Sequence, residues 1–347
     1  MPTTRKVKET FAKSKANNGP KPIWDLYDDG LTQGAISTFL DCRHQFWLKY
    51  VMGYRNKAKA GATFFGSAFH DILAAIQFSK TGKPKTLERA ASDYLKSLGT
   101  LSPSVLEETN CMLAQIKMLI ELYNQRWEAE HAEREWLKRE ETFRFVYEFV
   151  KPGSEQVIDI PLRGRWDGVF QTKKAKELRL HETKTKGRID EEGIAKSLPF
   201  DTQTMLYSLA IQRQIKKGTP KGTCYDVIRN PQLKLKQGET TTQFVDRCAK
   251  DVQDRPDWYF LRFNVSITEA ELTHWENHFL APVLWQIVQW WESIKARPIE
   301  PWKSPLHFMR PGAFWSVYGR SDMFEALTSG NTFSLERREI PFPELVD

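Results

Sequence analysis

The spacing of apolar residues predicts helices in the first third of the chain. Between Leu31 and Tyr50, apolar side chains recur at helical intervals behind serine and threonine residues that can cap a helix. Residues 67–79 show the same period. A longer helix is expected to begin at Pro103, because proline fits the first turn of a helix, and to run to about Trp136.

Beyond residue 140 the pattern changes to the alternation that is typical of β-strands. Strands are predicted over residues 142–150, 159–170 and 177–184, and a lysine-rich turn joins the last two into a hairpin. A helix is expected over residues 199–216 and a fourth, short strand over residues 223–229. The middle of the chain therefore predicts a sheet with at least one helix packed on it.

The remaining residues return to a helical pattern. Thr268 and Glu271 have the spacing of a capping box, which predicts a second long helix to about Ile294, bent at Pro282. No element is predicted after Pro298. This order of elements is that of an α+β protein whose sheet is covered by helices.

Composition narrows the class of protein. The 347 residues are 40% hydrophobic, 27% charged and 12% aromatic, which is typical of a globular chain with a sizeable core. No apolar run approaches the roughly 18 residues of a membrane span, and no signal-peptide stretch or CxxC pair occurs. The sequence therefore predicts a soluble, cytoplasmic protein without a disulfide framework.

The net charge of +7 lies mostly in one segment. Residues 1–22 carry six basic side chains and one acidic side chain, so the rest of the chain is nearly balanced. Residues 1–24 are predicted to form a basic, disordered tail, which either attracts phosphates or only keeps the protein soluble. The overall charge does not indicate the function, so the function has to be inferred from a candidate active or binding site.

Candidate chemistry lies on the predicted hairpin. Leu178, Leu180, Glu182 and Lys184 fall on one side of a strand, because side chains alternate. Two charged residues that continue a core-facing side must emerge into a cleft or pair with each other, since unpaired buried charge is costly. On the preceding strand, Asp167 lies close to two glycines, whose missing side chains leave room for a ligand or a backbone to approach.

Pairing of these strands would bring Asp167 and Glu182 side by side. Clustered carboxylates repel each other unless a cation relieves them, and hard oxygen ligands suit Mg²⁺ or Mn²⁺. Lys184 would point into the same pocket, where it could orient an attacking water and offset charge in a phosphorane-like transition state.

These residues resemble the PD-(D/E)XK nucleases, specifically the RecB-like exonuclease branch of the CRISPR-associated and phage type. That branch has a histidine four positions after a glycine on a helix, an aspartate on the second core strand, E-x-K on the third strand, and a Q-x-x-x-Y helix. The matching residues are Gly66, His70, Asp167, Glu182, Thr183, Lys184, Gln203 and Tyr207. The resemblance covers roughly residues 31–78 and 140–230.

The resemblance implies a restriction-endonuclease-like core, in which a mixed central sheet is flanked by helices, with additional N- and C-terminal helices. On this basis we expect a single nuclease domain over residues 25–347. Its catalytic core would occupy about residues 60–230, and a helical and aromatic extension would occupy residues 231–347.

The resemblance also implies the role of each site residue. Metal ligands would be His70, Asp167, Glu182 and the backbone carbonyl of Thr183. Lys184 would be the catalytic lysine, and Gln203 and Tyr207 would steady the active site and the DNA strand. The implied reaction is hydrolysis of a phosphodiester by in-line attack of water, with Mg²⁺ or Mn²⁺ as cofactor.

Many RecB-like relatives also hold an iron–sulfur cluster, with one cysteine near the first helix and three near the C-terminus. Cys42 matches the first of these, but the C-terminal region has no cysteine. An iron–sulfur cluster is therefore not expected.

The implied substrate is DNA, either single-stranded or at its ends, in recombination, repair or phage DNA processing. A recombination protein or a helicase is a candidate partner. Four basic residues flank the predicted pocket and are expected to contact the DNA backbone: Arg163, Arg165, Lys186 and Arg188.

Two alternatives stay open: an endonuclease on the same core, and a non-catalytic DNA-binding or scaffold protein that retains the fold. Two further motifs are interpreted as structural. Glu271, His274 and His278 share a helical face, which is typical of a solvated flank as well as of a zinc site. Gly61 and Gly66 have P-loop spacing but lack the lysine that must follow.

Overall fold

The computed structural model describes residues 21–346 except for residues 57–60, 78–83, 216–217 and 297–334. Most of the predicted basic tail and most of the segment after Pro298 lie outside the described residues, as does the end of the helix expected over residues 67–79. Within the described part of the chain, no helix is long and apolar enough to cross a membrane.

The contacts divide the chain into two compact units. We call one the aromatic unit, formed by Met1–Ala58, Val146–Leu162 and Phe279–Asp347. The other is the sheet unit, formed by Lys59–Phe145 and Arg163–His278. That both belong to the single domain expected over residues 25–347 stays a prediction.

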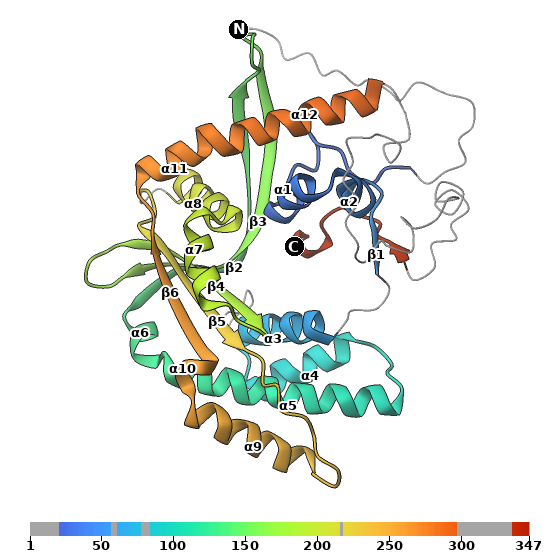
Figure 1. The fold of residues 1–347 in the computed structure, drawn as a ribbon, viewed down its shortest axis with the longest axis vertical. Helices are drawn as coiled ribbons and strands as arrows, with labels where there is room; N and C mark the ends of the chain where they lie inside the picture. Colours follow the sequence, from blue (N-terminus) through green and yellow to red (C-terminus); the bar gives the residue numbers. More distant parts are fainter. Residues whose placement is uncertain (1–20, 57–60, 78–83, 216–217, 297–334, 347) are drawn as a thin grey trace. The chain divides into compact units, whose positions relative to one another are not determined.

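A five-stranded mixed sheet with the order β2-β3-β4-β5-β6 organises the sheet unit (Figure 1). Strand β3 pairs with β4 antiparallel, β4 with β5 parallel, and β5 with β6 antiparallel. The far ends of the long strands β2 and β3 belong to the aromatic unit. The strands are β2 Arg134–Val150, β3 Val157–Thr172, β4 Leu178–Lys186, β5 Gly222–Arg229 and β6 Phe260–Ser266.

Helices cover both faces of this sheet, as Figure 1 shows. Helices α3 (Gly61–Gln77), α4 (Leu87–Ser97), α5 (Pro103–Arg126) and α9 (Thr241–Asp254) share one apolar core, which Ile228 and Phe260 of the sheet also enter. On the other face, Leu178 and Leu180 of β4 pack with Ala210 and Ile211 of α8 (Thr202–Gln214). Different strands therefore supply the two cores: β5 and β6 contribute to the first, and β4 contributes to the second.

The shorter helices of the sheet unit lie between these elements. They are α6 Glu128–Ala132, α7 Glu191–Ser197, the 3₁₀ turn η2 Leu198–Phe200, α10 Pro256–Tyr259 and α11 Glu269–Trp275. The predicted capping box is present at α11, where the Thr268 side chain accepts from the N–H of Glu271 and Glu271 accepts from the N–H of Thr268.

The aromatic unit is built around packed rings. Trp24, Phe39 and Phe46 contact one another or Trp290 and Trp291 edge to face, with ring centroids 4.9–5.6 Å apart. Its elements are α1 Gln33–Asp41, α2 Arg43–Phe46, the π-helical turn η1 Trp47–Val51, α12 Ala281–Ala296, the paired strands β1 Tyr54–Asn56 and β7 Leu335–Arg337, and the turn η5 Pro343–Leu345.

The α+β fold and all four predicted strands are confirmed, whereas several helix boundaries are wrong. The helix expected from Leu31 to Tyr50 is interrupted at Cys42, whose extended backbone ends α1. The helix expected to reach Trp136 ends at Arg126, because residues from Arg134 onward extend β2. The bend expected at Pro282 stays a prediction, and a π-helical turn, η3 Glu276–Leu280, lies just before this proline. Helices α4 and α9 and strand β6 were not predicted.

Candidate metal centre and active site

Glu182 and Lys184 of β4 meet α8 in a buried polar cluster. The Glu182 side chain is fully buried, and its Oε2 accepts hydrogen bonds from Lys184 Nζ and from Gln203 Nε2, both at 2.8 Å. Asp201 caps α8 by accepting from the N–H of Thr204, which sets the start of the helix that carries Gln203. Glu182 Oε1 is buried and accepts no hydrogen bond from any described residue.

Asp167 of β3 lies beside the same strand, as the sequence predicted. Its Oδ2 accepts the backbone N–H of Thr183 at 2.8 Å, and His70 Nδ1 of α3 is 3.8 Å from the same oxygen. The flanking glycines do not leave open space for a ligand. A Cβ atom would meet the Phe143 ring at 2.6 Å at Gly164, and the Trp136 ring at 2.5 Å at Gly168. These glycines therefore admit aromatic rings of β2.

Glu140 of β2, which was not predicted as a site residue, lies with His70 and Asp167 in the same cluster. One ligand atom from each of His70, Glu140 and Asp167 lies within 4.8 Å of the others. Glu140 has a φ of 46°, a left-handed conformation that is uncommon outside glycine and that clusters at functional sites. Glu140 falls between the helix predicted to end near Trp136 and the strand predicted over residues 142–150, so no predicted element placed it beside the other site residues.

The electrostatics of this cluster favour a bound cation. Burial, reinforced by the charge of Asp167, raises the pKa of Glu140 and of Glu182 to about 8 in each case. Burial also acts to raise the pKa of Asp167, but His70, Lys184 and the Thr183 N–H together hold it below its ordinary value. Burial lowers the pKa of His70, which favours the neutral imidazole that can bind a metal.

The residues present fit a divalent metal. Carboxylate oxygens and one imidazole suit Mg²⁺ or Mn²⁺, and Glu182 Oε1 is a buried acceptor that receives no hydrogen bond from the described part of the chain. His70, Glu140, Asp167 and Glu182 would hold the ion. That the backbone carbonyl of Thr183 also binds it stays a prediction.

The raised carboxyl pKa values predict an unusual pH dependence of stability. A carboxyl group whose pKa is about 8 when folded, against an ordinary 4.5, stabilises the fold fully below about pH 4.5, and this contribution is lost as the pH rises through 8. In EDTA, the melting temperature should therefore fall between about pH 6 and about pH 9. Mn²⁺ binds the ionised groups, so it should raise the melting temperature more at the higher pH. A melting temperature that is flat or rising over this range in EDTA would contradict the assignment.

Removal of the Glu140 charge should weaken metal binding. Glu140→Gln is expected to reduce Mn²⁺ affinity at least about tenfold, because one anionic ligand is lost from the cluster. Calorimetric titration with Mn²⁺ measures this directly. The matched control is Glu141→Gln, since Glu141 is the next residue and pairs with Lys138 at 2.6 Å. Equal affinities in the two variants would remove Glu140 from the site.

The other predicted site residues take different positions. Tyr207 packs edge to face on Phe143, with ring centroids 5.2 Å apart, and forms a backbone hydrogen bond with Arg165. Arg165 pairs with Glu140 at 3.4 Å. It therefore contacts the carboxylate cluster, by which we mean His70, Glu140, Asp167 and Glu182 with Lys184 and Gln203. Arg163 and Lys186 are half-buried and Arg188 is exposed. DNA contact by these four basic residues stays a prediction.

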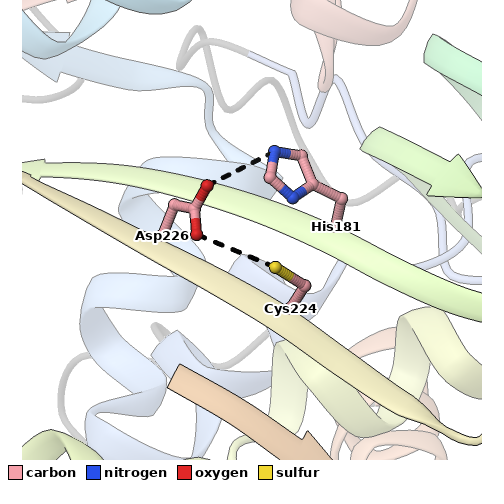
Figure 2. Close-up of side chains that lie close together, drawn as sticks. All are labelled: His181, Cys224 and Asp226. Carbon is pink, nitrogen blue, oxygen red and sulfur yellow. Dashed lines mark hydrogen bonds and ion pairs between the residues drawn. The ribbon is translucent and has the colours of Figure 1, made fainter. Parts of the chain in front are cut away.

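A second group of metal-ligating types lies on the opposite side of β4. His181, Cys224 and Asp226 are buried and close together (Figure 2). Two cations already occupy their ligand atoms. Arg262 donates to both oxygens of Asp226 at 2.6 Å, and Arg134 contacts His181 Nδ1 and Cys224 Sγ at 3.3 Å each. We interpret this group as a buried ion-pair network, because two guanidinium groups oppose a metal ion.

Glu271, His274 and His278 do not form a zinc site, because the Glu271 carboxylate is already used. The rings of His274 and His278 are 4.4 Å apart, but the Glu271 carboxylate accepts from both the N–H and the hydroxyl of Thr268. The capping role of Glu271 accounts for its spacing from Thr268.

A family model described as the PD-(D/E)XK nuclease superfamily matches residues 30–305. The search of curated proteins finds no match. The matched range includes every residue of the carboxylate cluster, from His70 to Gln203.

Proposed function

The chain belongs to the PD-(D/E)XK nuclease superfamily, and from this premise we propose that it is a divalent-metal-dependent DNA exonuclease. The observation that carries this proposal is the convergence of His70, Glu140 and Asp167 beside a lysine-paired Glu182. A protein that only bound DNA would not need a buried glutamate with a raised pKa, Glu182, paired with the partly exposed Lys184.

Each residue of the cluster has a role in phosphodiester hydrolysis. The bound metal would polarise the phosphate and lower the pKa of a water molecule. Glu182 and Asp167 raise the pKa of Lys184 despite its burial, so this side chain stays cationic and can orient the water and offset developing negative charge. Gln203 holds the Glu182 carboxylate in place through its 2.8 Å hydrogen bond.

The finer parts of the proposal rest on the motif order. The Gly66–His70, E-x-K and Q-x-x-x-Y elements support the RecB-like branch, and with it exonuclease action in recombination, repair or phage DNA processing. A helicase or a recombination protein is the partner that this branch implies. An endonuclease on the same core is the alternative that the substrate test distinguishes.

The test uses end-labelled linear single- and double-stranded DNA and covalently closed circular DNA, each with Mg²⁺, Mn²⁺ or EDTA. The proposal predicts short labelled products from linear DNA with either metal, no products in EDTA, and intact closed circles. Cleavage of closed circles would replace the exonuclease with an endonuclease. No hydrolysis under any divalent ion would leave only a DNA-binding or scaffold role.

An exposed phenylalanine at the end of η2, just before α8, predicts contact with unpaired bases. Phe200 is 80% exposed and lies three residues before Gln203. Stacking of one base on an aromatic ring is worth about 1–3 kcal/mol, so Phe200→Ala should weaken single-stranded DNA binding by roughly 5- to 150-fold. Fluorescence anisotropy of a labelled oligonucleotide in EDTA measures this. Leu235→Ala is the control, because Leu235 is also an exposed apolar side chain of the sheet unit. Equal losses in both variants would exclude specific stacking on Phe200.

A further inference from the structure

The carboxyl-terminal ends of β4 and β5 border a cavity that the carboxylate cluster does not use. Its volume is about 590 Å³, which is large enough for a nucleotide. Helix α10 contacts β5 at this end of the sheet (Figure 1). The lining residues that matter here are Arg188, Arg229, Asn230, Asp251, Arg255 and Trp258.

Arg229 is a buried cation without a complete partner. The residue is 5% exposed, its Nε donates to the Trp258 carbonyl at 2.9 Å, and its guanidinium lies 3.6 Å from the Trp258 ring centroid. Its Nη2 is buried and forms no hydrogen bond with the described residues, and it is 3.9 Å from the Glu191 carboxylate. Such a group is costly unless an anion binds it.

The neighbouring residue adds an unused acceptor. Asn230 is 9% exposed, and its buried Oδ1 accepts no hydrogen bond within the described part of the chain. Both orphaned atoms belong to residues that line the cavity. Arg229 therefore supplies a donor and Asn230 an acceptor, and neither atom is hydrogen-bonded within the described residues. A ligand that carries both an acceptor and a donor would satisfy them.

The charge balance of the cavity is positive. Asp251 is neutralised by Arg255, whose Nη2 donates to both of its oxygens at 2.6 Å, and it also accepts from Tyr259. Arg188 is exposed at the end of β4. With Asp251 and Arg255 paired, Arg188 and Arg229 face the cavity against the half-exposed Glu191. The cavity thus favours an anionic ligand.

The strand register places this cavity next to the catalytic residues. Lys184 pairs with Val227 and Lys186 with Arg229, so Arg229 lies two residues beyond the level of Lys184. At about 3.3 Å per residue, this is about 7 Å along the sheet. One DNA strand rises about 3.4 Å per nucleotide, so a strand that leaves the carboxylate cluster along β4 reaches the cavity within a few nucleotides.

We propose that this cavity is a subsite for one nucleotide of the DNA strand near the bond that is cleaved. Arg188 and Arg229 bind its phosphate, Asn230 Oδ1 accepts from its base, and the half-exposed ring of Trp258 stacks on that base. The subsite rests on the proposed function, because it assigns a substrate contact to the same nuclease.

The test measures binding of the full chain to a fluorescent oligonucleotide of about a dozen nucleotides in EDTA, where no hydrolysis occurs. Trp258→Ala and Arg188→Ala should each weaken binding by roughly 5- to 50-fold. Arg213→Ala is the control, because Arg213 is an exposed arginine of the sheet unit that pairs with Glu276. Arg188 is exposed and its replacement does not threaten the fold, so this variant keeps the test valid if Trp258→Ala is unstable.

A second arm competes the oligonucleotide with free deoxynucleoside monophosphates. Nucleotide binding that the two variants abolish, with oligonucleotide binding unchanged, would assign the cavity to a free nucleotide and overturn the DNA subsite. Wild-type oligonucleotide affinity in both variants would also overturn it. If both variants lose affinity but no metal supports hydrolysis, the subsite stands and only the nuclease assignment fails.

Discussion

Replacement of Lys184 by alanine is expected to lower the rate of DNA hydrolysis by roughly 100- to 1,000-fold while the protein stays folded. Lys184 Nζ lies 2.8 Å from Glu182 Oε2, and its side chain is 29% exposed, so it borders the cluster from the solvent side. Its loss removes the cation that is placed to orient water and offset charge in the transition state. Single-turnover hydrolysis of end-labelled DNA with saturating Mg²⁺ measures the effect.

Lys186→Ala is the matched control for this prediction. Lys186 follows on the same side of β4, and we expect it to contact only the DNA backbone. Its replacement should raise the DNA concentration needed for half-maximal rate and leave the maximal rate within about twofold. A Lys184→Ala protein that cleaves DNA at the wild-type rate would exclude the proposed catalytic lysine.

Replacement of Asp226 by asparagine is expected to destabilise the fold by about 3–5 kcal/mol, because it leaves a buried guanidinium without its counter-ion. Asp226 is 1% exposed, accepts from Arg262 at 2.6 Å through both oxygens, and accepts from the Tyr123 hydroxyl at 2.6 Å. The network joins β5 and β6 to α5. Urea denaturation followed by circular dichroism gives the free energy of unfolding.

The control for this prediction is Asp246→Asn. Asp246 is exposed on α9, where a neutral substitution should change the free energy of unfolding by no more than about 0.5 kcal/mol. A loss below about 1 kcal/mol for Asp226→Asn would mean that the ion-pair network contributes little. If Asp226→Asn lowers the free energy of unfolding by about 3–5 kcal/mol and also releases a bound metal, His181, Cys224 and Asp226 would instead form a metal site.

The two sides of β4 carry different groups: one side carries the proposed catalytic residues, and the other contacts the ion-pair network that stabilises the fold. Glu182 and Lys184 point toward α8 and belong to the carboxylate cluster, whereas His181 points toward the network of Arg134 and Asp226. Strand alternation is sufficient to separate them. Substitutions at adjacent positions are therefore expected to affect different properties, namely catalysis for Glu182 and folding for His181.

The parts of the site that a strand pattern encodes could be predicted from the sequence. The alternation of Leu178, Leu180, Glu182 and Lys184 predicted the strand, and it predicted that the two charges emerge into a cleft or pair with each other. The structure shows the pairing, because Glu182 is fully buried and its Oε2 lies 2.8 Å from Lys184 Nζ. The structure confirms that Asp167 lies beside this strand, where it accepts the Thr183 N–H. Local spacing was sufficient because β3 and β4 form a hairpin.

Features that depend on distant segments could not be predicted. Glu140 joins the cluster through a left-handed backbone conformation within β2, and no sequence pattern marks that conformation in a glutamate. Its partner Arg165 was expected to contact DNA, because the pairing of two residues from different strands is not visible in either segment. Strand β6 was missed for a similar reason, since its partner β5 precedes it by about thirty residues.

The most direct test of this account is a crystal structure of the protein soaked in Mn²⁺, with the ion located by its anomalous scattering. The account predicts a peak within bonding distance of His70, Glu140 and Asp167, on the side of β4 that carries Glu182. A peak at His181, Cys224 and Asp226 instead, or none at saturating Mn²⁺, would contradict the metal centre and the nuclease function that depends on it.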